Sequence, residues 1–231
     1  MTKLTYSLIF ILFLSVNSFD IRNGISRPYY RKIEFLDSKF NLLGKRDSAD
    51  FEEKFAKLKI DHFSFDNEDT FNLRYLIKDK YFDKNITSSP ILFYCGNEAD
   101  IEMFWNNLGF ITETLAKEFK GLVIFAEHRF FGKSIPFGAQ DYDIKKNKYL
   151  TVEQAMSDFA EFLQSFKEEN KMTSHPVIAL GGSYGGMLAA WSRMKFPHVY
   201  KGAIASSAPI LLFEDIDKIS RNGLQISNLS A

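Results

Sequence analysis

The sequence predicts an α/β fold with a mainly parallel, doubly wound sheet. Short apolar runs typical of buried strands alternate with stretches of helical period, and this order places helices on both faces of one sheet. At one junction between a strand and a helix, residues 181–186 read Gly-Gly-Ser-Tyr-Gly-Gly. The 231 residues are 45% hydrophobic, enough for one sizeable core, and 29 basic residues balance 29 acidic ones, so nothing points to nucleic acid.

The expected elements begin with an antiparallel pair of strands. Residues 57–65 and 71–77 are aromatic and aliphatic runs on either side of a polar turn at 66–69. Thr151, followed three residues later by Gln154, predicts a capping box at the start of a helix. The other expected elements, in chain order, are strand 90–95, helix 102–120, strand 121–126, helix 152–167, strand 176–181, helix 187–195 and strand 200–208.

The glycine-rich turn has the pattern of a nucleophile elbow, in which a strand ends in a serine and a helix begins at once. Such a turn forces strained backbone angles on the serine, and three glycines leave room for the helix to fold back: Gly181, Gly185 and Gly186. It lifts the Ser183 hydroxyl above the sheet edge and aims the backbone N–H of Tyr184 at the position of an oxyanion. The pattern predicts nucleophilic acyl transfer, and the alternative is a turn that only packs the helix closely on its strand. A phosphate-binding loop is disfavoured because no Gly-Lys-Ser or Gly-Lys-Thr closes the stretch.

Residues 1–18 have the pattern of a secretory signal peptide, with a positive residue, a short apolar stretch and small residues before a cut after Ser18. The alternative is an uncleaved signal anchor. No other segment is long and apolar enough to cross a bilayer, so no stable membrane insertion is expected. Residues 19–50 carry many basic residues without a sustained apolar period, which predicts a leader or pro-segment. Within it, Lys45-Arg46 is either a dibasic processing site or part of a solvated basic stretch.

Two glycosylation triplets, at Asn85 and Asn228, support entry into the secretory pathway. Cys95 is the only cysteine, so the chain cannot close an internal disulfide, and its apolar neighbours predict a buried, inert thiol; the alternative is a partner cysteine on another chain or on further sequence. We find no motif for a metal ion or a cofactor and expect neither.

Several motifs spread along the chain resemble those of one family of enzymes. They are DHF at 61–63, FNLRY at 71–75, YCGNEAD at 94–100, AEHRFFGKS at 126–134, LTVEQA at 150–155, the elbow, FPH at 196–198 and ASSAPI at 205–210. The family is that of the serine peptidases that include lysosomal Pro-Xaa carboxypeptidase and dipeptidyl peptidase II. The resemblance implies an α/β-hydrolase fold, a peptide substrate with proline near one end, and a secreted or lysosomal protein.

The same resemblance implies roles for individual residues. Ser183 takes the position of the nucleophile. The loop at 96–98 takes the place where such enzymes supply a second oxyanion-hole N–H, from Asn97 or Glu98. Glu98 either presents a carboxylate to a substrate amine or only packs, and Met187 either lines a proline pocket or only packs.

The four histidines leave the catalytic base unassigned. In this architecture the acid and then the histidine follow the serine in sequence. His62, His128 and His175 all precede Ser183, and His128, at the end of a strand, is interpreted as structural. Only His198 follows the serine, near the end of the elbow helix, where a solvated or capping histidine is expected.

The resemblance ends near Asp215, and residues 216–231 form a divergent tail. Residues 51–215 are therefore expected to form a partial α/β-hydrolase domain, truncated after the strand that follows the elbow helix. Without a triad acid and histidine the chain is expected to be nearly inactive alone, because loss of a triad member removes a factor on the order of 10⁴ in rate. An uncovered sheet edge can pair with a second copy of the chain, so a homodimer is also considered.

Two alternatives to a peptidase remain open: an esterase with the same elbow, and a non-catalytic product that binds peptide or protein. The choice between carboxypeptidase and dipeptidyl peptidase specificity also stays open.

Overall fold

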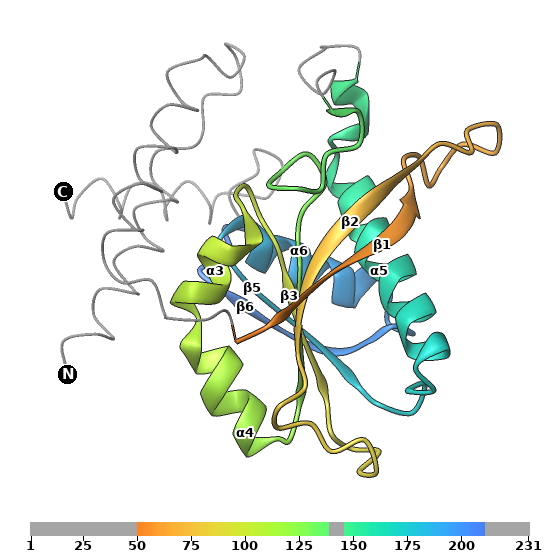
Figure 1. The fold of residues 1–231 in the computed structure, drawn as a ribbon. Coiled ribbons are helices and arrows are strands. Elements are labelled where there is room, and N and C mark those ends of the chain that lie inside the picture. Colours follow the sequence, from red (N-terminus) through yellow and green to blue (C-terminus); the bar gives the residue numbers. More distant parts are fainter. Residues whose placement is uncertain (1–49, 139–145, 211–231) are drawn as a thin grey trace, which may run out of the picture.

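The computed structural model describes residues 50–138 and 146–210 (Figure 1). They form one six-stranded sheet in the order β1-β2-β4-β3-β5-β6. β2 pairs with β1 and with β4 in the antiparallel sense, whereas β4, β3, β5 and β6 run parallel to one another. The strands are β1 Glu52–Lys59, β2 Thr70–Lys78, β3 Ile91–Cys95, β4 Leu122–Ala126, β5 Val177–Gly182 and β6 Tyr200–Ser206. The predicted α/β class with a mainly parallel sheet is confirmed. The predicted signal peptide, the predicted leader up to residue 49, Asn228 and the expected divergent tail lie outside the described residues.

Helices cover both faces of this sheet, as the α/β class requires. Figure 1 shows α3 and α4 on one side and α5 on the other, where α5 contacts α6. The helices are α3 Ile101–Asn107, a π-helix Phe110–Leu115, α4 Ala116–Glu118, a short 3₁₀ helix Asn147–Tyr149, α5 Val152–Glu169 and α6 Tyr184–Lys195. Every residue of β3 and of β4 is buried, because helices cover both of their faces.

The side chains of β3 alternate between two apolar clusters. Phe93 belongs to the larger cluster, which includes residues of α5 and α6, and Tyr94 belongs to the smaller one, which includes residues of α3. Cys95 is fully buried in the larger cluster, as predicted, and burial raises the pKa of its thiol far above the ordinary value. A buried neutral thiol of this kind is not a nucleophile.

The first strand lies earlier than the sequence predicted. The pairing of β1 with β2 runs from Glu52 opposite Ile77 to Lys59 opposite Thr70, so residues 60–69 form the connection. The chain turns where the Asp61 side chain accepts a hydrogen bond from the N–H of Phe63 (3.0 Å). The predicted antiparallel pair is therefore confirmed, but the bounds of its first strand, 57–65, were wrong. Phe63 and Phe65 of that run lie exposed in the connection.

One predicted helix is divided, and one predicted helix cap is only partly as expected. The helix expected over 102–120 is divided, since α3 ends at Asn107 and a π-helix follows after Leu108. The Thr151 cap is confirmed, because its side chain accepts from the N–H of Gln154 (3.2 Å). The Gln154 amide does not complete a capping box but donates to the Asp61 carboxylate (2.7 Å), which ties α5 to the turn after β1. Within the two described ranges, no helix combines the length and apolar character needed to cross a membrane.

Candidate active site

Ser183 lies on the sharp turn that the sequence predicted between β5 and α6. β5 ends at Gly182 and α6 begins at Tyr184, so the serine is the single residue between them. Its backbone has φ 55° and ψ −124°, a conformation that residues other than glycine rarely adopt. Such strain persists only where neighbouring contacts fix the backbone. Here the N–H of Ser183 donates to the carbonyl oxygen of Ser206 (3.0 Å), and the Ser183 carbonyl accepts from the N–H of Met187 (3.0 Å).

Three glycines let α6 fold back onto the sheet, as the sequence predicted. A Cβ atom at Gly181 would lie 2.0 Å from the carbonyl oxygen of Gly185, and a Cβ atom at Gly185 would lie 2.6 Å from the carbonyl oxygen of Cys95. A Cβ atom at Gly186 would lie 3.0 Å from the carbonyl oxygen of Ser206. The prediction that these positions must be small is confirmed. Gly182 differs, because a Cβ atom there would have no neighbour within 4 Å.

The loop after β3 lies directly beside the elbow. Asn97 is buried, and its side-chain amide donates to the carbonyl oxygen of Gly182 (3.3 Å) while its side-chain oxygen accepts from the hydroxyl of Tyr94 (3.4 Å). Tyr184 is the first residue of α6, so its N–H belongs to the group at a helix N-terminus that has no acceptor within the helix. The structure thus brings together the two segments from which the sequence predicted oxyanion donors.

Glu98 and Met187 flank this arrangement in different ways. Glu98 is exposed, yet neighbouring atoms desolvate its carboxyl enough to raise its pKa above the ordinary value. Its carboxyl also contributes to the raised pKa of the Tyr184 phenol, whose main cause is burial. Met187 is almost fully buried, one helical turn after the serine.

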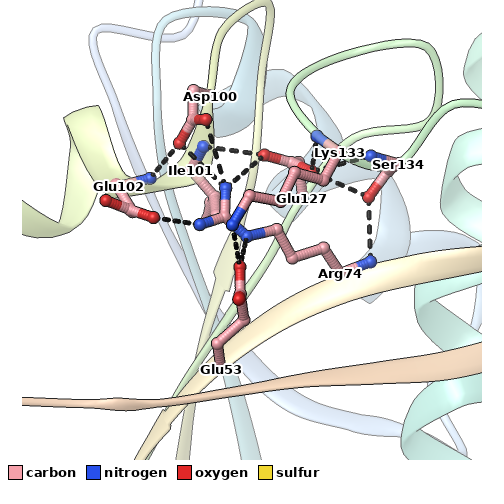
Figure 2. A network of polar contacts seen from close by, with 8 residues as sticks. All are labelled: Glu53, Arg74, Asp100, Ile101, Glu102, Glu127, Lys133 and Ser134. Carbon is pink, nitrogen blue, oxygen red and sulfur yellow. Dashed lines mark hydrogen bonds and ion pairs between the residues drawn. The ribbon is translucent and has the colours of Figure 1, made fainter.

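The far end of the loop after β3 is held by Glu127, which follows β4. Glu127 is fully buried, and one carboxylate oxygen accepts from the N–H of Ile101 (3.0 Å), where α3 begins. The other oxygen accepts from the N–H of Lys133 (2.8 Å) and from the N–H and hydroxyl of Ser134 (both 2.9 Å). Figure 2 shows these groups converging on the one carboxylate. Burial raises the pKa of Glu127, and the surrounding donors oppose that rise.

Arg74 of β2 lies in the same network and is also fully buried. Its guanidinium contacts four carboxylates, as Figure 2 shows: Glu53, Asp100, Glu102 and Glu127. Asp100 accepts from one guanidinium nitrogen with both oxygens (3.0 and 3.1 Å) and caps α3 by accepting from the N–H of Glu102 (2.8 Å). Burial disfavours the charged guanidinium, but the carboxylates outweigh this and raise the pKa of Arg74. The loop at 96–100 is thus fixed at its far end by two buried charged residues that sequence reasoning did not single out.

Two of the four histidines lie near the elbow side of the sheet, and both are engaged with other groups. The His62 ring contacts Asp158 (2.7 Å) and Glu161 (3.0 Å) on α5. His128 is buried, with one ring nitrogen 2.7 Å from the Arg129 carbonyl oxygen and the other 3.0 Å from the Tyr184 hydroxyl.

The other two histidines lie at the opposite edge of the sheet. His175 is buried just before β5 and bonds to the carbonyl oxygen of Ser89 (2.9 Å). His198 is exposed beyond the C-terminal end of α6, a helix of 12 residues and therefore about 18 Å long, at the far end from Ser183. In the part of the chain that the structure describes, each histidine thus has surroundings other than the serine hydroxyl.

A cavity of about 580 Å³ lies away from the serine. Lys78, at the end of β2, and Leu122, at the start of β4, line it together with Met172 from the segment after α5. These residues mark the edge of the sheet where the parallel strands begin, whereas Ser183 lies where they end. Among residues 50–138 and 146–210, no cluster of three or more His, Cys, Asp or Glu side chains could hold a metal ion.

A serine at a strained turn between a strand and a helix, at the carboxyl edge of a mainly parallel sheet, defines an α/β hydrolase. A family profile described as "Serine carboxypeptidase S28" matches residues 58–220. The chain belongs to this family of serine peptidases.

Curated relatives agree with this membership. The human protein named "Lysosomal Pro-X carboxypeptidase" is 52% identical over 160 residues, which cover 68% of this chain and 32% of the relative. The Caenorhabditis elegans protein named "Prolyl carboxy peptidase like protein 5" is 48% identical over 168 residues, covering 71% of this chain and 32% of that protein. The chain thus spans about a third of the length of these relatives.

Solved structures of similar shape include an esterase from Pyrococcus furiosus, with 20% identity and a TM-score of 0.49 over 76% of this chain and 55% of that one. Another is a post-proline cleaving enzyme from Rickettsia typhi, with 17% identity and a TM-score of 0.46 over 80% of this chain and 27% of that one.

Proposed function

We propose that this chain forms the nucleophile-bearing part of a serine carboxypeptidase that cleaves peptides beside a proline, with Ser183 as the nucleophile. The observation that carries the proposal is the backbone of Ser183, held at φ 55° between β5 and α6 in a chain of the S28 family. In the proposed reaction the Ser183 hydroxyl attacks the peptide carbonyl and gives up its proton to a base. The protonated base then donates this proton to the leaving amine as the C–N bond breaks. Water hydrolyses the acyl-enzyme, giving a proton to the base, which returns it to the Ser183 oxygen as the acid product leaves.

The oxyanion formed in this reaction is proposed to lie between two backbone segments. The N–H of Tyr184 is one donor, and the N–H of Asn97 or Glu98 is the second. The hydrogen bond from the Asn97 side chain to Gly182 supports this assignment, because it keeps the loop and the elbow at a fixed separation. No cofactor takes part in the proposed mechanism.

The base and the acid of the triad are proposed to come from outside the described residues. All four histidines of the 231-residue sequence lie within the described ranges, and each has other surroundings. The curated relatives extend over about three times the matched length, so we place the histidine and the acid in sequence that corresponds to the rest of those relatives. On this proposal the 231 residues alone are nearly inactive, because a serine without its base is a weak nucleophile at neutral pH.

Substrate choice is proposed from the names of the relatives, which are called Pro-X carboxypeptidases. Met187 is proposed to border the proline pocket, since it is buried on α6 one turn from the serine. Glu98 has two candidate roles, an oxyanion donor through its N–H or a carboxylate that binds a substrate amine. Glu98→Gln separates them, since only the second role predicts a selective rise in KM for substrates with a free amino end.

Entry into the secretory pathway, with a lysosomal or extracellular destination, is proposed for the whole protein. The relatives named lysosomal support it, together with the predicted signal peptide at 1–18. Asn85 is exposed on a turn between β2 and β3, so its triplet is accessible for glycosylation. A shift in mass on treatment with an endoglycosidase, lost in Asn85→Gln, tests this site.

The test of catalysis uses the native protein that carries this chain. A fluorophosphonate probe should label wild type at Ser183, and Ser183→Ala should abolish both labelling and hydrolysis. Ser174→Ala, an exposed serine far from the elbow, is the matched control and should react as wild type does. Release of the residue after a penultimate proline indicates a carboxypeptidase, release of an amino-terminal dipeptide indicates a dipeptidyl peptidase, and hydrolysis of simple esters alone indicates an esterase. A native protein that does not react with the probe would instead be the non-catalytic product.

A further inference from the structure

His128 is the second residue after the end of β4, and both of its ring nitrogens are hydrogen-bonded. One of them, Nδ1, lies 2.7 Å from the carbonyl oxygen of Arg129, which can only accept a hydrogen bond. Nδ1 therefore carries a proton. Burial lowers the pKa of His128 to about 4, so the ring is neutral above that pH and its Nε2 is an acceptor. The Tyr184 hydroxyl, 3.0 Å away, must then donate to Nε2.

This hydrogen bond acts on the residue that follows the nucleophile. Tyr184 has its backbone N–H at the start of α6, beside Ser183, and its hydroxyl bonded to His128, in the segment that follows β4. The two rings also pack together, with centroids 5.5 Å apart. The first turn of a helix lacks intrahelical acceptors for its N–H groups, so an anchored side chain there restrains the direction of those groups.

We propose that His128 is a positioning residue for the acyl transfer, and that it holds the Tyr184 N–H in place for the oxyanion through the Tyr184 hydroxyl. The inference rests on the proposed function of Ser183. On this proposal His128 contributes to catalysis through its hydrogen bond with the Tyr184 hydroxyl, and not only to stability through its burial.

Four charged groups influence the His128–Tyr184 pair. Arg129, next in sequence, and Asp158 of α5 influence the pKa of His128, and Glu98 and Glu153 raise the pKa of the Tyr184 phenol. Protonation of His128 turns Nε2 into a donor, so the Tyr184 hydroxyl can no longer donate to it. The wild-type kcat should therefore fall on the acid side with an apparent pKa near 4.

The test compares His128→Asn, Tyr184→Phe and the double variant in the native protein. The asparagine side chain can still donate to the Arg129 carbonyl but does not reach the Tyr184 hydroxyl, and phenylalanine removes the same hydrogen bond from the other side. We expect kcat per titrated Ser183 to fall by about tenfold in each single variant, less than for complete loss of an oxyanion donor, with KM unchanged. The double variant should be no worse than either single one, and the acid limb near pH 4 should vanish in all three.

His175→Asn is the matched control, because His175 is also buried and also bonds through Nδ1 to a backbone carbonyl, at the other edge of the sheet. It should lower stability but leave kcat per titrated site unchanged. If His128→Asn and Tyr184→Phe reduce only the titratable fraction, as His175→Asn does, or if their effects on kcat are additive, the positioning role is wrong. If wild type neither reacts with the probe nor hydrolyses prolyl peptides, the proposed function itself fails, and the role of His128 fails with it.

Discussion

Replacing Gly185 by alanine tests how closely the elbow helix must approach the sheet. The new Cβ atom would lie 2.6 Å from the Cys95 carbonyl oxygen and 3.1 Å from the Asn97 side-chain oxygen. Contacts between carbon and oxygen in proteins are about 3.3 Å or longer, so α6 and the end of β3 must separate by about 0.7 Å. The obstructing Cys95 atom belongs to the backbone of a central strand, paired on both sides, and cannot move aside alone.

This separation has two consequences of predictable size. Overpacking of a buried contact costs about 1–3 kcal/mol in the free energy of unfolding. The same displacement moves Ser183 and Tyr184 away from the loop that carries Asn97, and a misplacement of about 1 Å lowers the rate of catalysis by about 100-fold. We therefore expect Gly185→Ala to lose about 2 kcal/mol of stability and at least tenfold in the rate of phosphonylation of Ser183.

Gly182→Ala is the matched control for stability, since its Cβ atom would have no neighbour within 4 Å. Urea denaturation of the native protein and of both variants measures the stability, and the time course of labelling by a fluorophosphonate measures the reactivity of the serine. If Gly185→Ala unfolds at the same urea concentration as Gly182→Ala and reacts as fast as wild type, close backbone contact is not what shapes the elbow.

Three further predictions concern the remainder of the described chain. Lowering the pH from 7 to 5 should cost about 2 kcal/mol through His128, because its pKa falls from 6.5 to about 4 on folding and the unfolded chain takes up the proton first. This stability is present above pH 6.5 and lost toward pH 4, and His128→Asn should remove that share in urea denaturation at the two pH values. Arg74→Met should lower the free energy of unfolding by about 3–5 kcal/mol in urea denaturation, because it leaves the Glu127 carboxylate buried beside other acids. Glu53→Gln is the control, since Glu53 is partly exposed, and it should change the free energy of unfolding by less than about 1 kcal/mol. The 231-residue chain should self-associate through β6, the strand at one edge of the sheet, where Ile204 is 55% exposed. Ile204→Lys should shift the sedimentation of the chain toward that of the monomer. An unchanged sedimentation profile would show that the chains do not associate through this edge.

The nucleophile turn could be predicted from sequence because its pattern is local. A strand, a serine, a helix and small residues stand next to one another, and the close approach of Gly181 to Gly185 follows from that order. The sequence did not show that Gly185 lies against Cys95, because that contact joins segments about 90 residues apart. The central strands were predictable for a related reason, since residues buried on both faces form continuous apolar runs.

The first strand could not be placed from its residues alone. Phe63 and Phe65 continue an aromatic pattern typical of a strand, yet the position of β1 is decided by its pairing with β2 and by the contacts of the following turn with α5. His62, for instance, donates its N–H to Gln154, 92 residues away. Hydrophobic pattern carries no information about a partner at that distance, so the prediction failed where tertiary hydrogen bonds override local propensity.

The run Glu127-His128-Arg129 belongs to a motif that the sequence analysis quoted, and His128 was interpreted as structural, but the partners of the three residues could not be predicted. All three are buried, although they are polar residues directly after a core strand. Glu127 binds the start of α3, His128 binds the start of α6, and Arg129 forms a two-point ion pair with Asp158 of α5 (2.6 and 2.7 Å).

Burial of these charges is a poor way to gain stability, since an apolar replacement of similar volume often serves as well or better. The run instead fixes the positions of the segments that it binds. Its backbone continues from β4 and stays fixed to the sheet, because the N–H of Glu127 donates to the Arg74 carbonyl (2.9 Å). Consecutive residues on one fixed backbone thus bind the segment that follows Asn97 and the segment that follows Ser183. The backbone after β4 therefore helps to set the distance between the two proposed oxyanion donors, together with the hydrogen bond from Asn97 to Gly182 at the end of β5. We infer that the proposed oxyanion site is organised within the described part of the chain, independently of the base that activates the serine.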